Sequence, residues 1–193
     1  MSMKRIIRRL GYLRAFAREC FVSASRNNSS SLASACRRRL YRTPCEVDTG
    51  VFITNIDNFS SGAESCLYHA CYILNHHGRF TMGRRSHMGA FCYVNVCYGT
   101  VSIGDDVAIG PGTKVIAHSN HYLPGRKVTE ERITADVVIG NNIFIGANCV
   151  ILPGTVIRDN VVVGAGSIVK GELESNTIYA GAPCRKIKSG WYE

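Results

Sequence analysis

The stretch "VVIGNNIFIGANCVILPGTVIRDNVVVGAGSIV", residues 137–169, repeats with a period of six residues. An apolar residue occupies every sixth position from Ile139 to Val169, and glycine follows it at Gly140, Gly146 and Gly164. An α-helix needs a spacing near 3.6 and a sandwich strand alternates with period two, so neither explains this pattern. A six-residue period is typical of a parallel β-helix, in which short strands stack from coil to coil.

The same register continues upstream and defines the expected core. Before residue 137, the apolar position of the repeat is occupied by Phe91, Cys97, Ile103, Ile109 and Val115. A small or branched residue recurs four positions later, at Val101, Val107, Thr113, Ile143, Cys149, Thr155, Val161 and Ser167. We therefore expect an all-β domain over residues 46–183, with glycines such as Gly104 and Gly110 at corners that a Cβ would obstruct.

Two segments of this domain depart from the period. In residues 46–90, Leu67 and Ile73 keep the register but Arg79 and Arg85 do not, which predicts irregular first coils with at least one slip of phase. In residues 117–136 the in-register positions include His121 and Lys127, which a dry core would not accept without a large free-energy cost. We expect residues 117–136 to leave the wall as a loop, and long loops on rigid scaffolds are usually functional.

The net charge of +9 is carried by residues 1–45, which hold eleven basic residues and one acid. A neutral body with a basic arm argues against a nucleic-acid partner. Residues 1–21 have helical apolar spacing with arginines on the other face, and a Ser/Asn-rich linker follows. A capping helix, a peripheral membrane-surface helix and a transit peptide all fit this segment. At the other end, residues 184–193 form a short basic tail.

The chain contains nine cysteines, an odd number, without a CxxC pair, and shows no signal peptide or membrane span. Reduced, mostly buried thiols in a cytoplasmic protein, with peripheral membrane contact left open, are the simplest interpretation.

The segments "YVNVCYGTVSIGDDVAIGPGTKVIAHSNH" and "IGNNIFIGANCVILPGTVIRDNVVVGAGSIVKGELESNTIYAGAPCRKIK" resemble the hexapeptide-repeat acyltransferases. The resemblance is strongest to the galactoside, maltose and capsule-sugar O-acetyltransferase branch. It implies a left-handed parallel β-helix, a homotrimer with active sites between subunits, and transfer of acetyl from acetyl-CoA to a sugar hydroxyl in polysaccharide or glycolipid biosynthesis. It implies no metal.

The residues present fit this chemistry. A sugar hydroxyl needs a general base before it can attack a thioester, and histidine titrates near neutral pH. By resemblance the base lies just past "IGPG", where His118 and His121 are the two candidates, and the Asn-His pair at His121 matches the motif best. Asn95 matches an asparagine that contacts the acceptor.

The donor site follows from the same resemblance. Ala147, Ala165 and Lys170 match positions that line the pantetheine arm of CoA, and Arg185 and Lys188 would bind its phosphates. One departure concerns Lys170-Gly171, because the family usually has Thr-Lys there, so the lysine lies one place early.

Other functions remain open at this point. An N-acetyltransferase for an amino sugar and an antibiotic acetyltransferase belong to the same class, although Trp191 lies far from the base. A zinc hydratase would need His87, His118 and His121 to converge on a metal. A non-catalytic β-helical scaffold is the third class, and the His-bearing loop with the basic CoA-end motif speaks against it.

Overall fold

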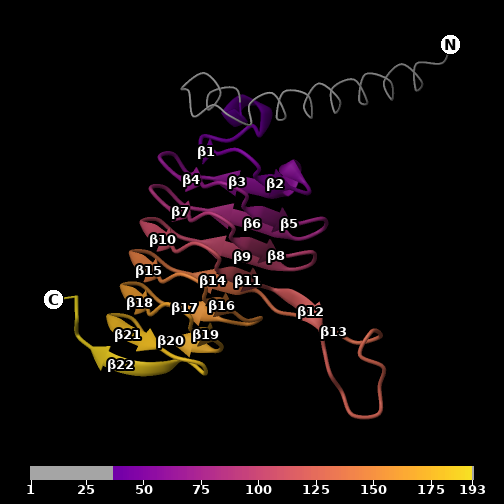
Figure 1. Ribbon diagram of the computed structural model, residues 1–193, viewed down its shortest axis with the longest axis vertical. Coiled ribbons are helices and arrows are strands. Elements are labelled where there is room, and N and C mark those ends of the chain that lie inside the picture. Colours follow the sequence, from indigo (N-terminus) through magenta and orange to yellow (C-terminus); the bar gives the residue numbers. More distant parts are fainter. Residues whose placement is uncertain (1–36, 193) are drawn as a thin grey trace.

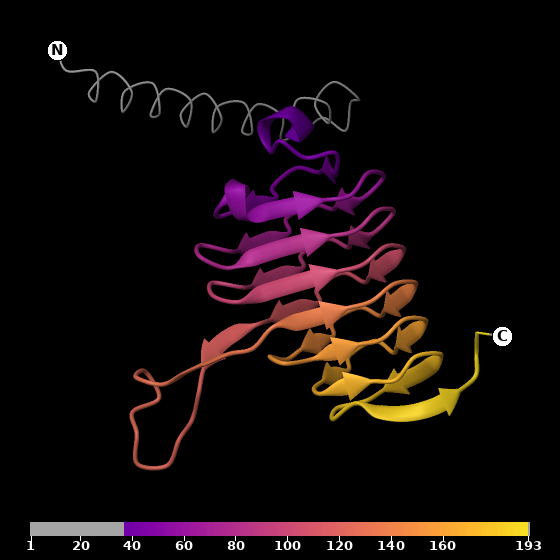
Figure 2. The same cartoon turned by 180° about the vertical axis from the view of Figure 1, so that it is seen from behind.

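Each coil of the chain contributes one short strand to each of three parallel sheets, and the coils stack into the column seen in Figures 1 and 2. The computed structural model describes residues 37–192. The predicted parallel β-helix is therefore confirmed. The expected helix and linker lie almost wholly outside the described residues, apart from a helical turn at residues 37–40. No helix within residues 37–192 is long and apolar enough to cross a membrane.

The three walls of the column are called here sheets A, B and C. Sheet A runs through β1 (Glu46–Val47), β4 (Cys66–Leu67), β7 (His87–Met88), β10 (Val107–Ile109), β15 (Ile143–Ile145), β18 (Val161–Val163), β21 (Thr177–Ala180) and β22 (Arg185–Ser189). Sheet B runs through β2 (Phe52–Ile53), β5 (Tyr72–Leu74), β8 (Tyr93–Asn95), β11 (Lys114–Ile116), β16 (Val150–Ile151) and β19 (Ile168–Val169). Sheet C runs through β3 (Phe59–Ser61), β6 (Arg79–Met82), β9 (Thr100–Ile103), β14 (Val137–Ile139), β17 (Val156–Ile157) and β20 (Glu172–Leu173).

Two smaller elements complete the column. The 3-10 helix η2 (Ile56–Asn58) lies between β2 and β3 in the first coil. At the other end, β22 runs antiparallel to β21, with Lys188 opposite Ile178. Most of the expected basic tail is therefore the edge strand that closes sheet A.

Apolar side chains at the repeat positions fill the interior. Ile109, Ile145 and Val163 form one such column of buried residues on sheet A. The glycine that follows each of these positions allows the coils to approach closely. A Cβ on Gly110, for example, would lie 2.5 Å from the backbone nitrogen of Ala147 in the next coil. The glycines predicted at corners are therefore needed for coil-to-coil contact.

The first coils are regular, so the expectation of irregular ones is wrong, whereas the expected slip of phase is present. Val94 and Ile103 both face the core although nine residues separate them, and Ile73 and Met82 repeat this in the coil above. The three additional residues lie at the turns that join sheet B to sheet C, called here the B–C corner. They break the six-residue register in the sequence while the strands remain stacked.

This correction also changes two predicted core residues. Phe91 is 63% exposed at a corner with φ of 61°, and Cys97 is only half-buried at the B–C corner. Arg79 is exposed because the inward position on β6 is the neighbouring Phe80. The register counted backwards from Ile103 fails for a physical reason, because the corner holds extra residues.

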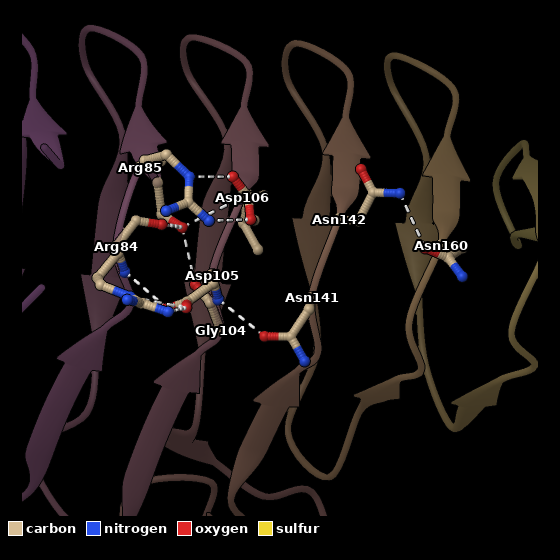
Figure 3. A network of polar contacts seen from close by, with 10 residues as sticks. Arg84, Arg85, Gly104, Asp105, Asp106, Asn141, Asn142 and Asn160 are labelled. Carbon is tan, nitrogen blue, oxygen red and sulfur yellow. Dashed lines mark hydrogen bonds and ion pairs between the residues drawn. The ribbon is translucent and has the colours of Figure 1, made fainter.

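A ladder of polar side chains follows the turns between sheets C and A (Figure 3). Arg84 and Arg85 form ion pairs with Asp105 and Asp106 of the next coil, at 2.9 Å and 2.7 Å. Two further coils continue it with side-chain amides, and Asn142 Nδ2 donates to Asn160 Oδ1 at 2.8 Å. Asp and Asn are well suited to this corner because the second turn residue has positive φ, as at Asp106, Asn142 and Asn160.

Candidate active site

The excursion leaves the column at the B–C corner. Its ends are joined where the Ala135 N–H donates to the Ala117 carbonyl at 3.0 Å. Beyond this point β12 (His118–Asn120) and β13 (Arg132–Thr134) pair antiparallel as an arm that projects from the stack (Figures 1 and 2). Residues 121–130 beyond the arm are exposed. The predicted loop is present, and it leaves from the corner that already carries extra residues in earlier coils.

A pocket of about 370 Å³ lies between the arm and the outer face of sheet B. Its lining consists of Asn95, Ile116, Ser119, Asn120, Ile133, Leu152, Pro153 and Lys170. The volume is within the usual range for small-molecule sites, and a mainly apolar wall with a few polar groups is typical of them.

The sheet register explains how distant residues meet in this pocket. Asn95 and Ile116 are paired neighbours on β8 and β11, and both point outward. Leu152 and Lys170 follow β16 and β19 at the equivalent end of the next two coils. Asn95 is fixed in part by its own turn, because its Oδ1 accepts a hydrogen bond from the Cys97 N–H at 3.4 Å. Two of the predicted site residues, Asn95 and Lys170, are thus brought together.

His118 lies at the root of the arm and is half-buried. Its Nδ1 is 2.7 Å from the hydroxyl of Thr134, the residue opposite it on β13. The ring of Tyr98, from the preceding coil, meets the imidazole edge-on at a centroid distance of 5.0 Å. Sequence reasoning missed both partners, because the pairing of β12 with β13 across a long loop leaves no signal in the six-residue repeat.

His121 is exposed, and its backbone continues the pairing of the arm, since its N–H donates to the Glu131 carbonyl at 3.0 Å. Alternate residues of a paired strand point to opposite faces. By this alternation His121 shares a face with Ser119 and His118 shares a face with Asn120, and both Ser119 and Asn120 line the pocket. Neither histidine lines the pocket within this chain.

Comparison with known proteins agrees with this architecture. The profile of bacterial transferase hexapeptide repeats (six repeats) matches residues 136–171. The chain is 31% identical over 161 residues to the putative lipopolysaccharide biosynthesis O-acetyl transferase WbbJ of Escherichia coli, covering 78% of each chain. The chain belongs to the hexapeptide-repeat transferase family.

Two further similar proteins cover different shares of the chain. The galactoside O-acetyltransferase of Escherichia coli is 40% identical over 116 residues, which is 56% of each chain, so the match spans little more than half of that enzyme. The structure of AntD, an N-acyltransferase from Bacillus cereus in complex with dTDP and 3-hydroxybutyryl-CoA, superposes with a TM-score of 0.67 at 27% identity. It covers 75% of this chain and 79% of that one.

The other predicted donor residues lie apart from the pocket. Ala147 and Ala165 stack at the corner between sheets A and B, at the opposite edge of sheet B from Lys170. Arg185 and Lys188 are exposed on β22, where the intervening Lys186 forms an ion pair with Glu174 at 2.5 Å. One chain therefore offers two separate surfaces, a pocket with Lys170 and an alanine corner.

Two cysteines near the end of the column and His87, the third histidine of the zinc alternative, are placed less favourably for chemistry. Cys149 is fully buried, and burial raises the pKa of its thiol and of the Cys184 thiol, which disfavours a thiolate nucleophile. His87 packs edge-on against Tyr68 on sheet A and does not approach His118. Within residues 37–192 no group of three or more His, Cys, Asp and Glu side chains could hold a metal ion.

Proposed function

We propose that this protein is an acetyl-CoA-dependent O-acetyltransferase that acetylates a sugar hydroxyl of a polysaccharide, a glycolipid or their precursor. The observation that carries the proposal is the pocket at the root of the arm. It joins an amide that can bind a hydroxyl, Asn95, to a cation on the donor side, Lys170. The sugar O-acetyltransferases among the relatives support the acceptor class.

His121 acts as the general base in this proposal. It removes the proton of the acceptor hydroxyl as the oxygen attacks the thioester carbonyl, and the imidazolium then protonates the departing thiolate. Backbone N–H groups of a coil corner can stabilise the tetrahedral oxyanion. The exposed side chain of His121 supports it over His118, whose Nδ1 is bound to the Thr134 hydroxyl.

The donor would be bound between two copies of the chain in a homotrimer. The alanine corner at Ala147 and Ala165 and the pocket at Lys170 lie on opposite edges of sheet B. Two copies placed side by side would bring one corner of each to a shared groove. Arg185 and Lys188 would then bind the CoA phosphates as exposed cations on the last strand.

The setting of the reaction is part of the same proposal. Among the described residues the seven cysteines are free thiols, which supports a reducing, cytoplasmic compartment. A membrane contact through residues 1–21 remains a prediction, since these residues lie outside the described part.

Transfer to an amine is the second candidate, because the superposed AntD is an N-acyltransferase in complex with dTDP. An amino sugar linked to a nucleotide would then replace the hydroxyl acceptor. The geometry of Asn95 and the arm is compatible with either nucleophile, so the acceptor must be tested directly.

The experiment is to measure thiol release from acetyl-CoA with the purified full chain and two acceptor sets, hydroxyl sugars and nucleotide-linked amino sugars. His76→Ala serves as the matched control for substitutions of His121, because His76 is an exposed histidine on an earlier coil. Release with hydroxyl sugars, equal in wild type and His76→Ala, supports the proposal. Release only with amino sugars would replace it by N-acetylation, and absence of both release and acetyl-CoA binding would reject an acyltransferase.

A further inference from the structure

Resting on the proposed function, we propose that His118 is a positioning residue, which fixes the root of the arm through Thr134 and Tyr98 so that His121, the residue after β12, is presented to the acceptor. The two histidines would then have different roles although only three positions separate them.

The first observation is the hydrogen bond across the arm. His118 and Thr134 are directly opposite each other in the β12–β13 register, and their side chains meet at 2.7 Å between Nδ1 and Oγ1. This contact closes the arm at its root, next to the backbone bond between Ala135 and Ala117. A side-chain bond at this position restricts the rotation of both strands.

The second observation is a row of rings that joins the arm to the column. The Tyr98 ring contacts the His118 imidazole at 5.0 Å and stacks on the His77 ring of the coil above at 5.3 Å, with 26° between the planes. All three rings lie along the B–C corner of successive coils. His118 is therefore held from the column side as well as from β13, which a histidine acting only on substrate would not require.

The third observation is how little else orients the loop. Beyond the arm, residues 121–130 are exposed. Two ion pairs, Arg126 with Glu131 at 3.8 Å and Lys127 with Glu130 at 3.4 Å, join loop residues to each other and lie at the surface. Exposed ion pairs of this kind contribute little to the stability of a fold. The direction of His121 thus depends mainly on the root of the arm.

Side-chain direction completes the inference. Ser119 and Ile133 are an opposing pair, and both line the pocket. His118 and Thr134 are the adjacent pair at the root of the arm, on the face that Asn120 shares, and they do not line the pocket themselves. A small rotation of the arm would displace His121 from the acceptor, and displacements near 1 Å can reduce a rate by about 100-fold.

Paired substitutions separate positioning from base catalysis. In His118→Asn the side-chain amide can take the place of Nδ1 toward Thr134, whereas in His118→Gln the amide takes the place of Nε2. We expect His118→Asn to retain kcat within about threefold, and His118→Gln and Thr134→Val each to lower kcat about 5- to 50-fold. Thr134→Ser, which keeps the hydroxyl, should restore activity, and KM for acetyl-CoA should stay unchanged throughout.

Two outcomes would overturn the assignment. Loss of activity in His118→Asn as large as in His121→Ala, with Thr134→Val unaffected, would make His118 the base. Wild-type kcat in both His118→Gln and Thr134→Val would show that the contact positions nothing. A double variant His118→Gln/Thr134→Val should lose no more than either single variant, because both remove one interaction.

A readout without substrate keeps the inference independent of the proposed reaction. Hydrogen exchange of the amides of His121 and Ala135 should be faster in Thr134→Val than in wild type or Thr134→Ser. If no acceptor supports transfer, the proposed function fails, yet faster exchange would still support the positioning of the arm. Unchanged exchange in Thr134→Val would reject it whatever the activity.

Discussion

Asn95 and Lys170 line one pocket although they come from β8 and from the turn after β19. Between them lie Ile116 and Leu152, one from each intervening coil, at the equivalent outward position of sheet B. The stacking of coils converts positions distant in sequence into a continuous wall. In the proposed function, this order of coils has the acceptor side at Asn95 and the donor side at Lys170.

Replacing Lys170 by methionine should raise KM for acetyl-CoA about three- to tenfold and leave kcat nearly unchanged. The ammonium group is exposed, so its interaction with the donor is worth little more than a surface ion pair. Steady-state kinetics against acetyl-CoA test this. Lys127→Met is the matched control, because Lys127 lies on the exposed loop. Equal KM in wild type and Lys170→Met would remove Lys170 from the donor site.

Replacing Asn95 should impair use of the acceptor. We expect Asn95→Ala to lower kcat/KM for the acceptor about tenfold, as a lost hydrogen bond to a hydroxyl predicts. Asn95→Asp keeps the oxygen that accepts from the Cys97 N–H and removes the amide donor. If Asn95→Asp lowers kcat/KM for the acceptor as much as Asn95→Ala does, the side-chain amide of Asn95 binds the acceptor. Full recovery in Asn95→Asp would mean that Asn95 only shapes its turn.

Gly110→Ala should destabilise the fold by about 1–3 kcal/mol, because the new Cβ would press on the backbone nitrogen of Ala147 and separate two coils. Urea unfolding with a fitted m-value measures this change. The control is Gly125→Ala in the loop, where a Cβ would meet nothing within 4 Å and only the positive φ of 76° opposes it. A loss in Gly110→Ala no larger than in Gly125→Ala contradicts the coil-contact argument.

The carboxylates at the turns between sheets C and A predict that the stability of the fold decreases in acid. Hydrogen bonds from the Arg84 backbone N–H and guanidinium lower the pKa of Asp105, and the Arg85 guanidinium lowers the pKa of Asp106. A lowered pKa in the folded state stabilises the fold above the unfolded pKa of about 3.9, and this contribution is lost as pH falls through the folded pKa.

The measurement for this corner is the urea midpoint between about pH 6 and pH 2.5. The double variant Asp105→Asn/Asp106→Asn should show a shallower decline in acid than wild type. Asp57→Asn removes one carboxylate charge, against two in the double variant, at an exposed position on η2 with only a 3.9 Å contact to Arg42, and should follow the wild-type curve. Identical curves for all three proteins would show that the ladder does not couple to protons.

The repeat alone predicted most of the fold, because a stacked core imposes its period on residues such as Ile139, Ile145 and Ile151. It failed at Phe91 and Cys97, since extra residues in a corner shift the register without disturbing the strands. The candidate site, by contrast, was predicted only in part. Asn95 and Lys170 follow from the resemblance. Thr134 reaches His118 only through the pairing of β12 with β13, which no local sequence pattern encodes.

The most direct test of the account follows labelled acetyl from acetyl-CoA to product with wild type and His121→Gln. We predict that wild type transfers the label to a hydroxyl of a sugar acceptor, and that His121→Gln lowers kcat about 10²- to 10⁴-fold while acetyl-CoA binding and the folded state are retained. Transfer by His121→Gln at the wild-type rate, or label found on an amine alone, would contradict it.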